Sequence, residues 1–194
     1  MTFNSLPRLV LTGPESSGKS VLAKALAEHL DGVLATEYLR DYFEVRGELT
    51  LEDAIPIAQG QWVNEERAAD RAQAENKLLV CDTDLVSSLV YSAHYYEDEL
   101  NTPLWALWEQ WSERHKKRLK SPPYSPRLYI LCDTDCPWVA DGQRDAPDDR
   151  DRFHRLFKAE LEALECDYIC VSGSVDERVS AVLSHLVQLH LKRD

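Results

Sequence analysis

The segment Gly13-Pro14-Glu15-Ser16-Ser17-Gly18-Lys19-Ser20 decides the fold of this chain, because it matches the pattern G-x4-G-K-S. An apolar run from Leu9 to Thr12 precedes it, and a segment of helical period follows it. This strand, loop and helix context is the one in which the pattern binds phosphate. The glycines let successive backbone N–H groups point at phosphate oxygens, with the positive end of the following helix dipole behind them. The sequence therefore predicts a nucleoside triphosphate site on this loop.

Two side chains of the loop are expected to carry chemistry. Lys19 is placed to reach the β and γ phosphates, and the Ser20 hydroxyl to bind the Mg²⁺ that bridges them. The guanine signature N-K-x-D does not occur in the sequence, so ATP is the preferred nucleotide. A chain of 194 residues is short for a motor or an oligomeric ATPase, which leaves small-molecule kinases as the natural class.

The charge balance limits the partners. Lys and Arg total 22 against 34 Asp and Glu, a formal net charge of −12. So acidic a surface repels nucleic acid and anionic lipid, and both are excluded as partners of the whole chain. We find no run of apolar residues long enough to span a membrane and no signal-peptide pattern at the start, so the expected location is the cytoplasm. The oligomeric state is left open.

Short apolar runs alternate with segments of helical period, which predicts one α/β domain over residues 1–194. We expect a five-stranded parallel sheet, whose strands are Leu9 to Thr12, Gly32 to Thr36, Leu78 to Cys81, Leu128 to Cys132 and Tyr168 to Val171. A helix is expected to start near Pro56, because proline and Gly60 weaken a helix interior. A capping box at Ser174 to Glu177 predicts the start of the last helix.

Two polar or proline-rich segments are predicted to be loops. Ser121 to Pro126 cannot continue a helix and must lead into the fourth strand. Residues 141–151 hold five aspartates together with Arg144 and Arg150, a composition too charged to bury. This second segment is interpreted as a lid that brings its arginines to the nucleotide.

Carboxylates follow the second and third strands, at the edge where open α/β sheets bind ligands. Glu37 could accept the proton of an attacking hydroxyl, with Arg40 clamping phosphate or holding Glu37. Asp82 is expected on the metal, and Asp84 beside the acceptor. The alternatives are a solvated ion pair for Glu37 and Arg40, and helix N-terminal caps for the two aspartates.

The aromatic and cysteine residues are mostly assigned to the core. Tyr95 and Tyr96 could wall a pocket for a flat ring, whereas the spacing of Trp105, Trp108 and Trp111 is typical of a core or interface stripe. The spacing of the five cysteines does not fit a zinc ribbon, and we expect buried thiols.

Four blocks together resemble the ribosylnicotinamide kinase domains of the NadR type, with matching order and spacing from Leu9 to about Leu186. They are the phosphate loop Gly13 to Ser20, Glu37-Tyr38-Leu39-Arg40, Asp82-Thr83-Asp84 and Trp138-Val139-Ala140-Asp141-Gly142-Gln143-Arg144. The resemblance implies a three-layer P-loop kinase fold around the five-stranded parallel sheet. It also implies a kinase that transfers the ATP γ-phosphoryl to the 5′-hydroxyl of nicotinamide riboside. Its product would be nicotinamide mononucleotide, in NAD salvage.

Carried over by position, the resemblance assigns roles to individual residues. Riboside contacts fall on Glu37, Tyr38 and Arg40, contacts with metal and ribose on Asp82 and Asp84, and lid arginines on Arg144 and Arg150. Further expected contacts are Tyr95, Trp138 and Asp141 for the riboside and Ser20 for the metal. Ala140 departs from the acidic residue expected there. Many relatives carry an adenylyltransferase domain with an H-x-G-H motif, which this sequence lacks, so the expected reaction stops at the mononucleotide.

The charge of the implied acceptor agrees with the residues. Nicotinamide riboside carries a positive ring, which carboxylates and the electron-rich faces of Tyr38, Tyr95 or Trp138 would favour over neutral nucleosides. Two other functions are consistent with the sequence: a kinase for a different nucleoside, because pocket shape sets ring specificity, and a regulatory module that binds ATP as a sensor without turnover.

Overall fold

A computed structural model describes residues 8–119, 126–138 and 149–191 of the chain. Five parallel strands form one sheet in the order β2-β3-β1-β4-β5. They are β1 (Arg8–Thr12), β2 (Val33–Ala35), β3 (Leu79–Asp82), β4 (Arg127–Cys132) and β5 (Tyr168–Val171). All five predicted strands are confirmed, with ends that differ by at most one residue.

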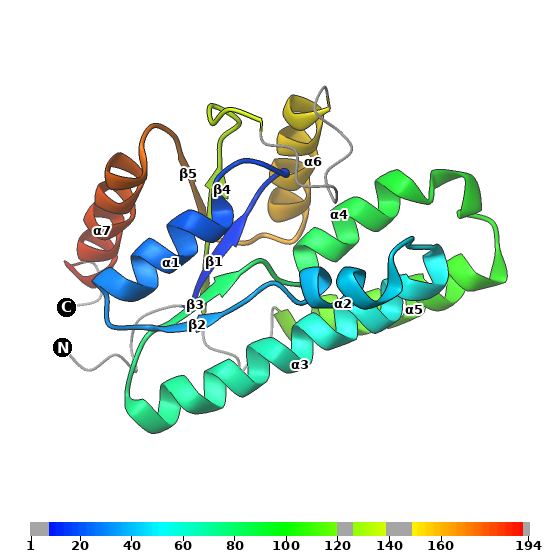
Figure 1. The fold of residues 1–194 in the computed structure, drawn as a ribbon, viewed down its shortest axis with the longest axis horizontal. Coiled ribbons are helices and arrows are strands. Elements are labelled where there is room, and N and C mark those ends of the chain that lie inside the picture. Colours follow the sequence, from blue (N-terminus) through cyan, green and yellow to red (C-terminus); the bar gives the residue numbers. More distant parts are fainter. Residues whose placement is uncertain (1–7, 120–125, 139–148, 192–194) are drawn as a thin grey trace.

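Helices cover both faces of the sheet and make three layers (Figure 1). One face carries α1 (Lys19–His29) and α7 (Val175–Leu191). The other carries α3 (Leu51–Glu75), α4 (Leu85–Tyr95), α5 (Pro103–Leu119) and α6 (Arg150–Ala163), while α2 (Tyr38–Arg46) lies against α3 and the short 3-10 helix η2 (Glu97–Glu99) follows α4. The predicted three-layer α/β fold is therefore confirmed. Among the described helices, none is both long and apolar enough to cross a bilayer.

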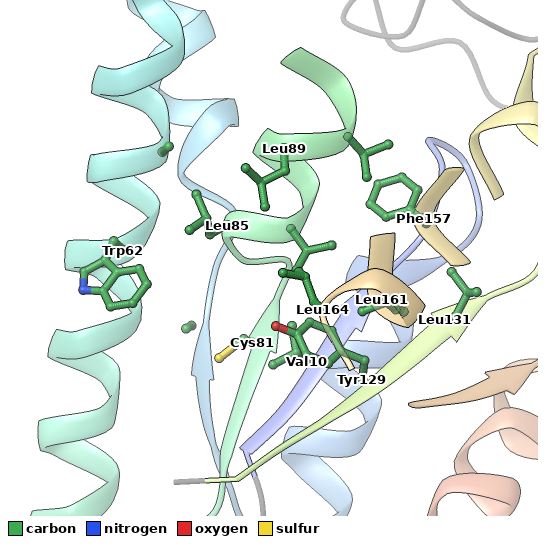
Figure 2. Close-up of a cluster of buried hydrophobic side chains, with 14 of the residues drawn as sticks. Val10, Trp62, Cys81, Leu85, Leu89, Tyr129, Leu131, Phe157, Leu161 and Leu164 are labelled. Carbon is green, nitrogen blue, oxygen red and sulfur yellow. The ribbon is translucent and has the colours of Figure 1, made fainter. Parts of the chain in front are cut away.

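Strand side chains alternate between two buried clusters, as expected for strands covered on both faces. Leu9 and Leu11 pack beneath α1 and α7, whereas Val10 packs beneath the helices of the opposite face. Figure 2 shows side chains of α3, α4 and α6 converging on Val10, Cys81 and Tyr129 in that second cluster.

The tryptophan stripe of α5 belongs to the core. Trp105 and Trp108 are buried in the cluster beneath α3 to α6, and Trp111 packs against it. The indoles of Trp108 and Trp111 are stacked with ring centroids 5.7 Å apart. The prediction of a core stripe, rather than a ligand wall, is confirmed for these residues.

The start of α3 corrects the sequence-based expectation, because the helix begins at Leu51 and continues through Pro56. The Thr50 backbone N–H donates to the Asp53 carboxylate at 3.0 Å, and the Asp53 N–H donates to the Thr50 carbonyl at 3.0 Å. This cap starts the helix one and a half turns before the proline. The proline removes one internal hydrogen bond without ending the helix, because the flanking Leu51, Ala54 and Ala58 are buried in the core.

The predicted cap of the last helix is confirmed, whereas the predicted burial of the thiols fails at Cys170. The capping box of α7 is confirmed, since the Ser174 N–H donates to the Glu177 carboxylate at 2.8 Å. The five thiols are free, but Cys170 is exposed on the edge strand β5, so the prediction of buried thiols is wrong there. Cys170 is in register with Leu131 and so faces the side of the sheet that carries α6, at an edge strand that has a neighbour on one side only.

The topology places the site at one edge of the sheet. The connection after β1 runs through α1 on one face, and the connection after β3 runs through α4 on the other. β1 and β3 are neighbours, so a crevice opens between their carboxyl ends, where ligands bind in open α/β sheets.

Candidate functional site

The loop between β1 and α1 has a backbone that favours glycine at two positions. Gly13 has φ 129°, and a Cβ there would lie 2.8 Å from the Cys132 carbonyl oxygen of β4. Gly18 has φ 84° and is the N-cap of α1. The loop thus turns tightly against the sheet and opens onto a helix N-terminus, the geometry that binds phosphate.

Lys19 lies across the opening of this loop. Its ammonium donates to the carbonyl oxygens of Gly13 at 2.9 Å and Pro14 at 2.7 Å, and the Ser17 hydroxyl also donates to Pro14 at 2.7 Å. These bonds hold a positive charge where the β and γ phosphates of a nucleotide on the loop would lie.

Two arginines, Arg178 and Arg150, donate hydrogen bonds to carbonyl oxygens of the phosphate loop. The sequence motifs indicated only Arg150. Arg178 of α7 is buried, and its Nη1 donates to the Ser17 carbonyl at 2.6 Å. The Nη2 of Arg150 donates to the carbonyls of Ser16 at 3.3 Å, Thr134 at 2.7 Å and Cys136 at 2.8 Å. Arg150 therefore lies beside the phosphate loop as the first residue of α6, rather than in a loop as the predicted lid implies. The end of that lid is helical because the Phe153 N–H bonds to the Asp149 carbonyl and Phe153 and Phe157 are buried.

A cleft of about 600 Å³ extends from the phosphate loop between α2, α3 and α4. This volume is typical of small-molecule sites. Its lining combines loop residues, three glutamates and a group of aromatic rings. The residues are Glu15, Ser16, Ser17, Gly18, Lys19, Ser20, Val21, Glu37, Leu39, Arg40, Phe43, Glu48, Leu49, Ala54, Ile57, Gln61, Thr83, Asp84, Ser87, Ser88, Tyr91, Ser92, Tyr95 and Tyr96.

The turn after β3 is a strained and buried part of the site. Thr83 has φ 73°, which is unfavourable for a β-branched residue, and its hydroxyl contacts that of Ser87. The neighbouring Asp82 is 6 % exposed, and its Oδ1 is fully buried without a hydrogen-bond partner among the described residues. Asp82 pairs in register with Leu11, whose side chain faces α1. An acceptor oxygen in this state fits a cation, so Asp82 and the Ser20 hydroxyl at the start of α1 are the residues suited to hold Mg²⁺.

Asp84 is the N-cap of α4, which is the helix-cap alternative considered for it. Its Oδ1 accepts from the Val86 N–H at 2.9 Å, and its Oδ2 accepts from the Tyr129 hydroxyl at 2.6 Å. The Arg127 guanidinium lies 3.7 Å from the same Oδ2. Burial raises the pKa of Asp84 to about 6, and Arg127 opposes that rise. Both oxygens accept hydrogen bonds within the protein, so Asp84 holds the start of α4; it also lines the cleft, and its predicted contact with the acceptor stays a prediction.

Glu37 lies at the N-terminus of α2, on the wall of the cleft. Its Oε2 is 2.9 Å from the Nε of Arg40, one turn along the helix. The side chain of Glu37 is 18% exposed, which leaves it accessible to a ligand in the cleft. The expected pairing of Glu37 with Arg40 is therefore present at the site rather than on a remote surface.

Of the other predicted riboside contacts, the structure places some on the cleft and others away from it. Tyr95 lines the cleft, with its ring stacked on Tyr91 at a centroid distance of 6.0 Å. Tyr38 instead packs on α3, where a Cβ on Gly60 would lie 2.0 Å from its ring, so Gly60 makes room for the tyrosine. Neither Tyr38 nor the half-buried Trp138 is among the described residues that line the cleft. Arg144 and Asp141, with most of the predicted lid, lie outside the described residues.

Tyr91 is a part of the site that the sequence motifs did not indicate. Burial raises the pKa of the Tyr91 hydroxyl, and the carboxylates of Glu15 and Glu37 add to the rise. Tyr91 therefore remains a neutral phenol between the phosphate loop and α2. Its position one turn before Tyr95 was the available signal, since residues four apart share a helix face.

A protein family and two curated proteins match most of this chain. A family model described as an AAA domain matches residues 8–178. Two curated proteins, each a trifunctional NAD biosynthesis/regulator protein NadR, are 30% identical in Escherichia coli K12 and 29% identical in Salmonella typhimurium LT2 over 172 residues. Those alignments cover 84% of this chain and 37% of each relative, so the chain spans little more than a third of their length.

Solved structures show the same fold at low identity. A crystal structure of NadR in complex with NR superposes with a TM-score of 0.69 at 20% identity, over 93% of this chain and 50% of the other. A deoxyadenosine kinase from M. mycoides with bound dATP has a TM-score of 0.54 at 9% identity, over 92% and 98% of the two chains. At these identities the likeness establishes the fold.

Proposed function

This chain belongs to the AAA-domain family of P-loop proteins, and we propose that it is an ATP-dependent kinase. The proposed reaction is phosphorylation of the 5′-hydroxyl of nicotinamide riboside. The products would be nicotinamide mononucleotide and ADP. The observation that carries the proposal is that Lys19 and Glu37 line one cleft with a group of aromatic rings. A phosphate-binding lysine and a carboxylate base then face the same volume. Similarity to NadR supports the choice of acceptor.

The proposed mechanism assigns the nucleotide to the loop from Gly13 to Ser20. Its N–H groups and Lys19 bind the β and γ phosphates, and Ser20 and Asp82 would hold Mg²⁺, which neutralises charge on the transferring group. Arg150 and Arg178 keep the loop in shape through the carbonyls of Ser16 and Ser17. Lysine and loop together stabilise charge that develops as the γ-phosphoryl moves.

The proposed base is Glu37, which accepts the proton of the 5′-hydroxyl as that oxygen attacks phosphorus. The Arg40 guanidinium, 2.9 Å from the Glu37 carboxylate, orients it at the wall of the cleft. Tyr91, a neutral phenol near Glu15 and Glu37, can donate a hydrogen bond to the riboside.

The acidic and aromatic lining favours a cationic acceptor. Glu15, Glu37 and Glu48 border the cleft, against the cations Lys19 and Arg40. Tyr91, Tyr95 and Tyr96 supply ring faces on α4 and immediately after it. A positively charged pyridinium ring gains from both features, whereas a neutral nucleobase gains only from the rings.

The test is ADP release from ATP and Mg²⁺ with nicotinamide riboside, thymidine, deoxycytidine, uridine or no acceptor, each repeated with Lys19→Ala. The proposal predicts release that requires both the riboside and Lys19. Preference for another nucleoside would retain the kinase and reject the acceptor. ATP binding without any acceptor-dependent release would favour a regulatory sensor module instead.

A further inference from the structure

Helix α3 carries three buried polar side chains on one face. Asp53, Gln61 and Glu65 are 2 %, 3 % and 2 % exposed, and they are spaced by multiples of four residues. A buried polar group is costly unless it is hydrogen-bonded, so each of these side chains is expected to hold a specific partner. Asp53 holds Tyr42 and the start of α3, and Glu65 holds Arg8 and Arg127. Of the three, Gln61 is the one that contacts two walls of the cleft.

The two ends of the Gln61 amide bond to backbone groups of different elements. Its Oε1 accepts from the Tyr38 N–H at 2.7 Å, and its Nε2 donates to the Thr83 carbonyl at 3.3 Å. A backbone N–H can only donate and a carbonyl can only accept, so the orientation of the amide is determined by its partners. One side chain thus joins the first residue of α2 to the turn after β3.

At the α2 end, Gln61 supplies an acceptor for a helix N-terminus whose N-cap side chain supplies none. The first N–H groups of a helix need acceptors, and the side chain of the N-cap residue commonly supplies one. The N-cap of α2 is Glu37, whose side chain makes no capping bond. Gln61 accepts from the first N–H of the helix, that of Tyr38, and the Glu37 carboxylate pairs with Arg40 at the cleft.

At the other end, Gln61 holds the residue between Asp82 and Asp84. The left-handed Thr83 needs surrounding bonds to keep its conformation, and the Thr83 N–H, carbonyl and hydroxyl all have partners. Helix α2 has no buried residue, so its place against α3 rests on the packing of the Tyr38 ring over Gly60 and on polar contacts such as that of Gln61. Gln61 thus links the start of α2 to the turn after β3, in addition to the pairing of β2 with β3 and the bond from the Asn64 amide to the Thr36 carbonyl at 2.7 Å.

We propose that Gln61 is a positioning residue. It fixes the position of the proposed base Glu37 relative to Asp82, the carboxylate proposed to bind the metal. The catalytic part of this inference rests on the function proposed above. Gln61 touches neither reacting atom in this assignment. It acts by fixing the start of α2 against the turn after β3.

The first experiment compares Gln61→Met with Gln59→Met in riboside-dependent ADP release. Methionine is close to glutamine in length but makes neither bond, and Gln59 is exposed on the same helix, which makes it the matched control. We expect Gln61→Met to lower kcat roughly 10- to 100-fold through misplacement of the base, with the KM for ATP changed less than about twofold. An unchanged kcat, or an equal loss in Gln59→Met, overturns the proposal.

The variant Gln61→Glu adds a pH-dependent test. The new carboxyl group still accepts from the Tyr38 N–H, but only its protonated form can donate to the Thr83 carbonyl. Its activity relative to the wild type should therefore recover as the pH is lowered from about 8 to about 6, because burial favours protonation. A ratio that stays constant with pH contradicts the assigned donor role.

Hydrogen exchange separates the failure of this proposal from failure of the proposed function. In Gln61→Met the Tyr38 amide loses its acceptor, so we expect its exchange to be at least about tenfold faster than in Gln59→Met. Unchanged exchange would overturn the link itself, whether or not the protein is a kinase. Faster exchange in a protein whose wild type releases no ADP with any acceptor would retain the link and reject its catalytic role.

Discussion

The guanidinium of Arg178 at the start of α7 donates to the carbonyl of Ser17 in the phosphate loop at 2.6 Å, across 161 residues of sequence. The same side chain bonds to Asp135, and to the Gly173 carbonyl at 2.9 Å. It therefore links the segments that follow β1, β4 and β5. The shape of the phosphate loop depends on this contact from the far end of the chain.

We predict that Arg178→Met weakens ATP binding about tenfold and lowers the unfolding free energy by about 1–3 kcal/mol, because the buried Ser17 carbonyl loses its donor. Titration calorimetry and urea denaturation measure the two effects. Arg152→Met, at an exposed position on α6, is the control and should change neither quantity. ATP affinity equal to that of the wild type would show that Arg178 does not shape the loop.

Gly13→Ala should abolish ATP binding, since the added Cβ would lie 2.8 Å from the Cys132 carbonyl oxygen. Gly47→Ala is the matched control, because Gly47 also has a positive φ, 78°, but no atom of the described residues lies within 4 Å of the place its methyl group would take. The control should lose stability through backbone strain while it keeps nucleotide affinity. Equal loss of ATP binding in both variants would contradict the role of the close approach to β4.

The two proposed carboxylate roles are separable by magnesium titration of the kinase assay. Asp82→Asn should raise the Mg²⁺ concentration for half-maximal rate by about tenfold or more, because it removes a charged metal ligand. Glu37→Gln should lower kcat at an unchanged Mg²⁺ requirement, by less than Lys19→Ala, because a loose transition state needs little base assistance. The opposite pattern would exchange the two assignments.

Acid should weaken the contact between α2 and α3. Burial alone would raise the pKa of Asp53, but hydrogen bonds from Tyr42 and Thr50 outweigh it and leave the pKa below its ordinary value. A lowered carboxyl pKa contributes stability above the unfolded-state value of about 3.9, and this contribution is lost as the pH falls through the lower, folded-state pKa.

Urea denaturation between about pH 2.5 and about pH 6 tests this linkage. The unfolding free energy of the wild type should fall more steeply below about pH 4 than that of Asp53→Asn. Asp70→Asn, at an exposed position on the same helix, should follow the wild type. Parallel curves for the wild type and Asp53→Asn would refute the contribution of this carboxylate.

Trp108→Ala should lower the unfolding free energy by about 3–5 kcal/mol, as expected for removal of a buried indole. Trp108 is 3 % exposed and stacks on Trp111, away from the cleft lining. Below the transition, calorimetry should therefore find ATP and riboside affinities equal to those of the wild type. Leu107→Ala, exposed on the same helix, is the stability control.

The sequence predicted best what depends on local patterns. The phosphate loop and the five strands are local signals, because glycine spacing and short apolar runs require no knowledge of distant partners. The predicted start of α3 near Pro56 is wrong, because the cap that Thr50 and Asp53 form starts the helix ahead of the proline.

Side chains that act through distant contacts could not be found in this way. Gln61 and Arg178 resemble ordinary helix residues in the sequence, and their partners lie 22 and 161 positions away. Asp84 illustrates the same limit: its strand-end position predicted a ligand contact, which stays a prediction, but not the bonds to Tyr129 and Val86 that hold the start of α4. Only the fold shows which of two neighbouring aspartates faces α1 and which caps α4.

Helix α2 forms a wall of the cleft while it contributes no buried residue to either core cluster. Its outer surface can therefore change in sequence without disturbing the packing on which the stability of the sheet depends. Descendants of this chain could acquire a different acceptor by replacing one nine-residue helix and retaining its polar contacts with α3. The same separation makes α2 the natural segment to randomise in a library that selects for new acceptors.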